Sequence, residues 1–133
     1  MRFSKPPTPK TPALGTLEVQ ILEHLWAASE PVDARSVLTA LAGRRISLST
    51  VQATLERLHR KGLLARQKVS RAFQYSASVS RERLIGTLIN DLAQRLAAGE
   101  LEPVISGFVD LVGEADPELL LRLESRAKAR RRE

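Results

Sequence analysis

The apolar residues of the first half of the chain recur every three or four positions, the spacing of amphipathic helices. A first helix carries a stripe of Leu17, Ile21 and Leu25, widened by Leu14, Leu22 and Trp26. Pro31 interrupts the pattern, and Asp33 can then cap a second helix, with Val32 packed against Val37 at its start. We expect that helix to bury Ala34, Val37, Leu38 and Leu41 and to stop near Gly43.

A third helix and a pair of strands follow. The helix begins at Ser47 or Ser49, since both residues can cap it, and buries Val51, Leu55 and Leu58. Between 64 and 77 the period changes to two, with a turn around Ser70 and Arg71. Three helices followed by a β-hairpin are the order of a winged helix-turn-helix. The predicted fold class is therefore mainly α with a small β-hairpin.

The remaining helices are apolar over more of their surface than one contact requires. One begins at Ser80, a second near Pro103 and a last one at Asp116–Pro117, where an N-cap precedes a proline. They are too short to bury two wide apolar stripes alone, so we expect a homodimer. The predicted dimerisation residues are Leu84, Ile85, Leu88, Ile89, Leu92, Leu96, Val104, Ile105, Phe108, Val109 and Val112.

Composition divides the chain and limits the class of protein. A proline-rich leader over 1–13 precedes a winged-helix domain over 14–79, a helical dimerisation region over 80–127 and a basic tail over 128–133. The chain has no apolar run of membrane-spanning length and no secretory signal, so a cytoplasmic location is expected. Without cysteines, and with two distant histidines, we expect no metal or cofactor. Motifs for nucleotide binding or covalent catalysis are absent, so no enzyme is predicted.

Positive charge is concentrated on the third helix and the hairpin. Residues 44–71 hold eight basic side chains against Glu56 alone. This pattern indicates one face that meets a polyanion, and double-stranded DNA is the expected partner. A solvated helix face is the alternative reading for each basic residue.

The third helix is predicted to enter the major groove, because its outward face is compact near the start and basic further along. Candidate base contacts are Ser49, Thr50, Gln52, Ala53 and Arg57. Candidate contacts to the DNA backbone are Arg60 and Lys61 on the helix, with Arg66, Lys68 and Arg71 on the wing.

Two other functions fit parts of the pattern. Phe73 and Tyr75 could stack on single-stranded nucleic acid, although their alternation favours packing under the wing. A winged helix can also serve as a protein-interaction module, but such a module has no need of the basic 44–71 segment.

Three separated blocks resemble the penicillinase repressor family. They are LGTLEVQILEHLW from Leu14, STVQATLERLHRKGLL from Ser49 and SRAFQYSASVSRERL from Ser70, in the family's order. The resemblance runs from Leu14 to the last helix. It implies a dimeric transcriptional repressor of β-lactam resistance or related stress genes, bound to a dyad-symmetric operator, with Thr50 and Arg57 at the family's recognition positions.

The same resemblance shows four departures from the family pattern. Ala53 stands where many members have a second threonine, and Ser70 stands where a glycine precedes Arg71. The Asn–Phe bond cut in some members corresponds to Gly107–Phe108, and the copper-responsive branch uses cysteines that this chain lacks. The inducing signal, whether a sensor-linked protease or a ligand, is therefore left open.

Overall fold

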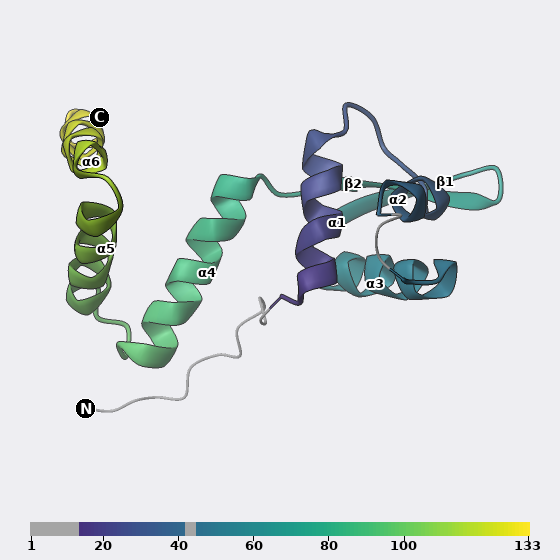
Figure 1. Ribbon diagram of the computed structural model, residues 1–133, viewed down its shortest axis with the longest axis horizontal. Coiled ribbons are helices and arrows are strands. Elements are labelled where there is room, and N and C mark those ends of the chain that lie inside the picture. Colours follow the sequence, from purple (N-terminus) through teal and green to yellow (C-terminus); the bar gives the residue numbers. More distant parts are fainter. Residues whose placement is uncertain (1–13, 42–44) are drawn as a thin grey trace. The chain divides into compact units, whose positions relative to one another are not determined.

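The computed structural model describes residues 14–41 and 45–133, which form six helices and one two-stranded sheet (Figure 1). The elements are α1 (Thr16–Ala27), α2 (Ala34–Ala40), α3 (Leu48–Arg60), β1 (Leu64–Val69), β2 (Ala72–Ala77), α4 (Arg81–Leu96), α5 (Glu102–Ala115) and α6 (Pro117–Arg131). The described residues divide into two compact units, 14–88 and 89–133. Among them, no helix is long and apolar enough to span a bilayer.

The first unit is a winged helix-turn-helix, as the sequence predicts. Helices α1, α2 and α3 are followed by the antiparallel pair β1–β2. The apolar stripes of all three helices meet in one core, which also receives Tyr75 from the wing. Its fully buried side chains, each less than 2% exposed, are Ile21, Leu22, Val37, Val51, Thr54, Leu55 and Leu58.

Two helices of this unit start on side-chain caps. The Asp33 carboxylate accepts a hydrogen bond from the Ser36 backbone N–H at 2.9 Å, as predicted for α2. For α3 the cap is Ser47, whose hydroxyl accepts from the Thr50 N–H at 3.2 Å. This decides between the two serines considered from the sequence. Helix α2 ends at Ala40; the predicted stop at Gly43 lies outside the described residues.

The wing is a tight hairpin. Strand pairing runs from Leu64 opposite Ala77 to Val69 opposite Ala72, which leaves Ser70 and Arg71 as the turn. Ser70 has a φ of 58°, in the half of the backbone map that favours glycine. The base of the wing is tied to the helices, because Tyr75 and Val32 exchange two backbone hydrogen bonds at 2.8 and 3.0 Å.

The first turns of α4 belong to the winged helix. The Trp26 indole N–H donates to the Val79 carbonyl at 2.8 Å, and the Arg81 guanidinium lies 4.7 Å from the centre of the Trp26 ring. Leu84 is 4% exposed and lies in the winged-helix core, with Leu88 packed against it. Leu84, expected at the dimer surface, is therefore committed to the N-terminal unit.

The second unit has almost no interior of its own. Helices α5 and α6, described over their whole length, contain no buried residue, and Ala93 is the only buried residue among described positions 89–133. Asp116 caps α6 by accepting from the Glu118 N–H at 3.0 Å, with Pro117 at the first helical position as predicted. Helix α6 continues to Arg131, so most of the predicted basic tail is helical.

Candidate nucleic-acid interface

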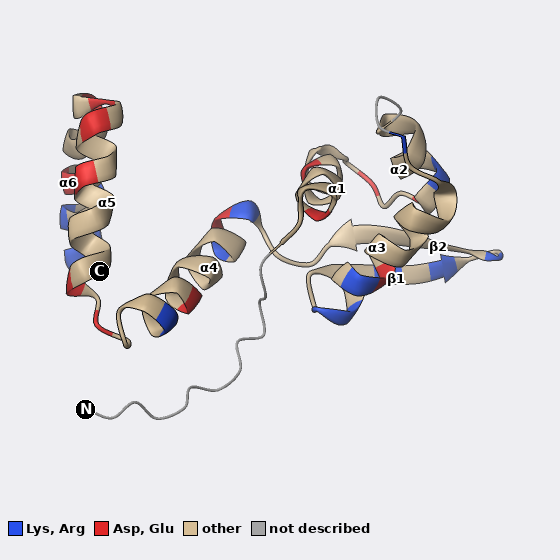
Figure 2. Ribbon diagram, turned by 60° about the horizontal axis from the view of Figure 1, so that its bottom comes forward, with Lys and Arg blue, Asp and Glu red and all other residues tan. Residues whose placement is uncertain are grey.

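Helix α3 presents a polar face opposite its buried stripe. Val51, Leu55 and Leu58 are 0% exposed. The five candidate base contacts are all exposed: Ser49, Thr50, Gln52, Ala53 and Arg57. The helix thus has a compact outer surface that no part of the described winged helix covers. Figure 2 shows basic residues on α3 and along the wing to its tip.

The first turn of that face is a cluster of hydroxyls. The Ser47 hydroxyl lies 3.1 Å from the Ser49 hydroxyl and 3.1 Å from the Thr50 hydroxyl. The Ser47 hydroxyl is fully used, since it also accepts from the Thr50 N–H, whereas the exposed Ser49 and Thr50 hydroxyls keep unused capacity, because a hydroxyl donates once and accepts twice. The N-terminal turn can therefore offer short donors and acceptors to a base edge or a phosphate.

The far end of α3 is closed by a glycine. Gly62 has a φ of +83°, a conformation that L-residues rarely adopt. Its N–H donates to the His59 carbonyl at 2.9 Å, and the Leu63 N–H donates to the Leu58 carbonyl at 3.0 Å. These two bonds make a Schellman motif, in which the buried Leu58 and Leu63 also come together. Gly62 therefore ends the recognition helix at a fixed residue and directs the chain into the wing.

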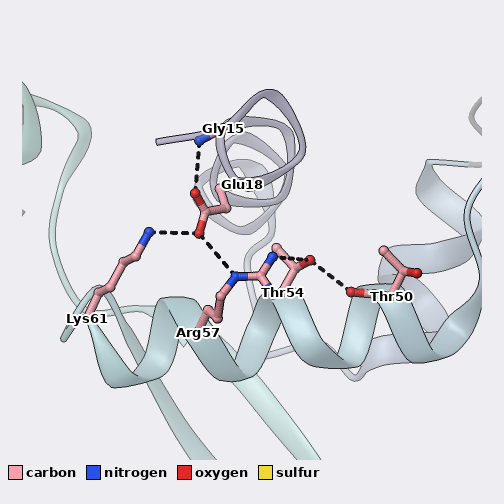
Figure 3. A network of polar contacts seen from close by, with 6 residues as sticks. All are labelled: Gly15, Glu18, Thr50, Thr54, Arg57 and Lys61. Atoms are coloured by element: carbon pink, nitrogen blue, oxygen red, sulfur yellow. Dashed lines mark hydrogen bonds and ion pairs between the residues drawn. The ribbon is translucent and has the colours of Figure 1, made fainter. Parts of the chain in front are cut away.

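A carboxylate from α1 lies between that helix and the basic end of α3 (Figure 3). Glu18 is 7% exposed, and its Oε1 accepts from the Gly15 N–H at 2.9 Å, closing the first turn of α1. Its Oε2 accepts from the Lys61 ammonium at 2.8 Å and lies 3.9 Å from Arg57 Nε. A residue outside the predicted interface thus contacts two residues inside it.

A second chain of hydrogen bonds holds Arg57 from the other side. Its Nη2 donates to the Thr54 hydroxyl at 3.2 Å, and that hydroxyl donates to the Thr50 carbonyl at 2.8 Å. Half of the Arg57 side chain, 51%, remains exposed. The guanidinium is therefore fixed along α3 and still has free N–H groups.

The surroundings of Glu18 keep it ionised. Burial raises the pKa of its carboxyl, but the Lys61 and Gly15 hydrogen bonds and the charges of Lys61 and Arg57 outweigh that effect. The pKa of Glu18 consequently lies below its ordinary value. The group is an anion at neutral pH, as its two cationic partners require.

The other carboxylate of this region, Glu56, connects α3 to the wing. Arg66 of β1 donates to Glu56 Oε1, and Arg60 Nε lies 3.8 Å from Glu56 Oε2. The guanidinium of Arg66 also lies 4.1 Å from the centre of the Phe73 ring. The hydrogen bond from Arg66 is the main reason that the pKa of Glu56 is lowered. Arg66 is thus held between a carboxylate and an aromatic face.

The predicted backbone contacts therefore fall into two groups. Lys61 and Arg66 have side chains only 20% and 24% exposed, and each donates a hydrogen bond to a carboxylate, Glu18 and Glu56 respectively. Arg60 is 67% exposed, and Lys68 and Arg71 are exposed on the wing. Glu18 and Thr54 were not among the predicted residues.

The wing aromatics are unequal. Tyr75 is 6% exposed and belongs to the core, whereas Phe73 is 37% exposed with Arg66 and Lys68 near its ring. Tyr75 consequently has no free face on which a base could stack. Within residues 14–41 and 45–133, no group of histidine, aspartate and glutamate side chains has the geometry of a metal site.

A winged helix with an exposed polar recognition helix and a basic hairpin defines the class of DNA-binding winged-helix proteins. The family model described as "Penicillinase repressor" matches residues 14–129, and the chain belongs to that family.

Individual relatives agree. The chain is 34% identical over 115 residues to the transcriptional regulator BlaI of Mycobacterium tuberculosis, covering 85% of this chain and 83% of that protein. It is 27% identical over 119 residues to the penicillinase repressor of Bacillus licheniformis, covering 86% and 92% respectively. Lactococcus lactis ZitR aligns over 88% of this chain and 73% of its own at 16% identity, with a TM-score of 0.43.

Proposed function

We propose that the protein is a sequence-specific transcriptional repressor that binds a dyad-symmetric operator as a homodimer. The observation that carries the proposal is the exposed face of α3, where hydroxyls occupy the first turn and a half-exposed Arg57 the last. Small side chains allow the helix to approach the groove closely, and an arginine held in one orientation can pair with guanine through two hydrogen bonds.

The wing supplies the contacts that fix register. Lys68 and Arg71 are exposed on the hairpin, and Arg60 is exposed at the end of α3. Long basic side chains of this kind bind phosphates without reading sequence. In this proposal the base edges are contacted by Ser49, Thr50, Gln52, Ala53 and Arg57. The phosphates are contacted by Arg60, Lys68 and Arg71.

Dimerisation is proposed for the second unit. An apolar groove of about 650 Å³ is lined by Ile89 and Leu92 of α4, by residues of α5 including Val104, Ile105, Phe108 and Val109, and by Leu123 and Ala127 of α6. Several of the large side chains of this unit are exposed, among them Leu92 at 48%, Ile105 at 53% and Phe108 at 44%. Exposed apolar surface of this extent, on helices without a core, supports an interface with a second copy.

The names of the relatives extend the proposal to genes. One relative is called a penicillinase repressor, which makes genes of antibiotic resistance the first candidates for regulation.

A direct test is to retain sheared genomic DNA on the full chain at about 0.15 M salt, near physiological ionic strength, with excess competitor DNA, and to sequence the retained fragments. A shared inverted repeat upstream of a few genes is expected. Retention without a common motif would leave only charge-driven binding and overturn the proposal.

Sedimentation tests the dimer separately. The expected result is twice the mass of the 14.7 kDa chain at micromolar concentration. A monomer that nevertheless retained the inverted repeat would refute the dimer and leave sequence recognition standing.

A further inference from the structure

Glu18 is a buried anion placed beneath two cations of the proposed DNA-binding surface. It comes from α1, 43 residues before Lys61, and Figure 3 shows it lying between Lys61 and Arg57. Winged-helix packing alone does not require a charge there. An apolar side chain would fill the space without the cost of taking a carboxylate out of water. The Gly15 N–H needs an acceptor oxygen, which a neutral glutamine would also supply, so the charge itself is attributed to Lys61 and Arg57.

The two partners are held to different degrees. The Lys61 ammonium donates to Glu18 at 2.8 Å, and the side chain is only 20% exposed. Arg57 Nε is 3.9 Å from the same oxygen and the side chain is 51% exposed. Lys61 is thus the close structural partner of Glu18, while Arg57 is oriented by it and left accessible.

We propose that Glu18 is a positioning residue for DNA recognition. With Thr54 it fixes the guanidinium of Arg57 along α3, and it withholds Lys61 from the phosphate backbone. The inference rests on the proposed function and deepens it: specificity depends on a residue that touches no DNA. It also revises the expectation for Lys61, which becomes an internal cation rather than a phosphate contact.

The physical reason lies in the balance between specific and nonspecific binding. A free lysine at the end of the recognition helix attracts every phosphate equally and strengthens binding to all sequences. An arginine whose guanidinium is held in one plane discriminates, because only one base edge fits its two donors. One buried carboxylate can therefore raise selectivity twice: it weakens binding to all sequences by occupying Lys61, and it strengthens base discrimination by orienting Arg57.

The first test uses the full chain with Glu18→Gln. Glutamine keeps the oxygen that accepts from the Gly15 N–H and removes the charge seen by Lys61 and Arg57. Wild type and variant are each used to select from a library of random-sequence duplexes, and binding to the selected duplex and to a scrambled duplex is measured over a salt series. Glu23→Gln is the matched control, since Glu23 is also on α1 but pairs with Arg81 at 3.7 Å.

For Glu18→Gln the preference for the selected duplex over the scrambled one should fall by at least about fivefold, the smaller end of what one bidentate arginine contact contributes. On scrambled DNA, the slope of the logarithm of the binding constant against the logarithm of the salt concentration should steepen by about one per subunit, because Lys61 becomes available to phosphates. Glu23→Gln should match the wild type in both measurements.

A second variant keeps the inference testable if Glu18→Gln does not fold. Lys61→Gln retains a donor for Glu18 and removes the positive charge; Lys68→Gln removes an exposed charge from the wing. On scrambled DNA, Lys61→Gln should leave the salt slope unchanged, whereas Lys68→Gln should reduce it by about one per subunit.

The outcomes separate this inference from the function on which it rests. A wild-type chain that enriches no sequence overturns the proposed function and the role of Glu18 together. Equal selectivity and equal salt slopes for wild type and Glu18→Gln overturn the role of Glu18 alone. A shallower slope for Lys61→Gln, equal to that for Lys68→Gln, would likewise show that Lys61 contacts phosphate.

Discussion

Arg66 of the wing donates a hydrogen bond to Glu56 of the recognition helix, across 10 residues of sequence. The bond joins the element proposed to read bases to the element proposed to hold the backbone. The Phe73 ring lies 4.1 Å from the same guanidinium, so Arg66 contacts an aromatic side chain of the wing and a carboxylate of α3 at once.

Replacing Glu56 with glutamine should loosen the wing without unfolding the domain. The charge-assisted bond becomes a neutral one, which is weaker, and Glu56 is partly exposed, so solvent already screens the pair. Amide hydrogen exchange in 64–77 should accelerate by about two- to fivefold, the range of an exposed ion pair. Glu124→Gln, which breaks an exposed pair with Lys128 on α6, is the control and should leave the wing unchanged.

Ser70→Gly should stabilise the protein. The serine sits in the turn at a φ of 58°, where a side chain is strained and glycine is not. Relief of strain exceeds the extra chain entropy of glycine, so the free energy of unfolding should rise by about 0.5 to 1 kcal/mol. Ala72→Gly, next to the turn in an ordinary strand conformation, should lower it by a similar amount. Urea titrations measure the free energy of unfolding of both variants. A decrease in both would contradict backbone strain at Ser70.

Arg57→Ala should cost about 1 to 3 kcal/mol of operator binding and relax preference at one base pair per half-site. Arg60→Ala is the comparison, because Arg60 is a neighbouring exposed arginine assigned to phosphate. It should weaken all sequences alike and reduce the salt slope by about one per subunit. An unchanged base preference in Arg57→Ala would show that α3 does not read DNA through this residue.

Leu92→Glu should separate the proposed dimer. Leu92 lines the apolar groove and is 48% exposed, so the charge is tolerated in one chain and must be buried unpaired in two. Burial of unpaired charge costs several kcal/mol, which weakens association by at least about 100-fold. Leu121→Glu, at a 66% exposed position outside the groove lining, should remain dimeric. Sedimentation of both variants distinguishes the groove from any other surface.

The stability of the fold should fall in acid, and Glu18 should be one cause. Its pKa is lowered in the folded protein from an ordinary value of 4.5, and that of Asp33 is lowered from 3.8 by the Ser36 N–H. Between the two pKa values of each group the unfolded chain binds more protons, so acid favours unfolding. The stabilisation is complete above about pH 4.5 and is lost as the pH falls through the folded-state values. Denaturant titrations over this range should give a flatter profile for Glu18→Gln.

The sequence predicted the elements well where local chemistry decides them. Periodicity placed the first helices and the hairpin, and the caps at Asp33 and Asp116 follow from one carboxylate three or two residues before an unpaired N–H. The choice between Ser47 and Ser49 could not be made from the sequence, because each offers the same hydroxyl two residues apart. In the structure α3 begins at Leu48, so Ser47 is the residue that caps it.

Long-range partners were not predictable. Nothing in the periodicity of α1 indicates that Glu18 contacts Lys61, and its position also satisfies an ordinary role in the first helical turn. The sequence pattern predicts Leu84 at a dimer surface because it shares a stripe with Leu88. In the structure the winged-helix core covers it, since Trp26 holds the start of α4 against α1.

Helices α5 and α6 contain no buried residue, so the behaviour of the protein depends on how many chains a cell contains. Helices that gain an interior only in the proposed dimer are stable only where chains meet, so folding of this unit depends on protein concentration. Operator occupancy then follows the square of the number of free chains at low abundance. A small fall in synthesis would empty the operator more sharply than a monomeric repressor could.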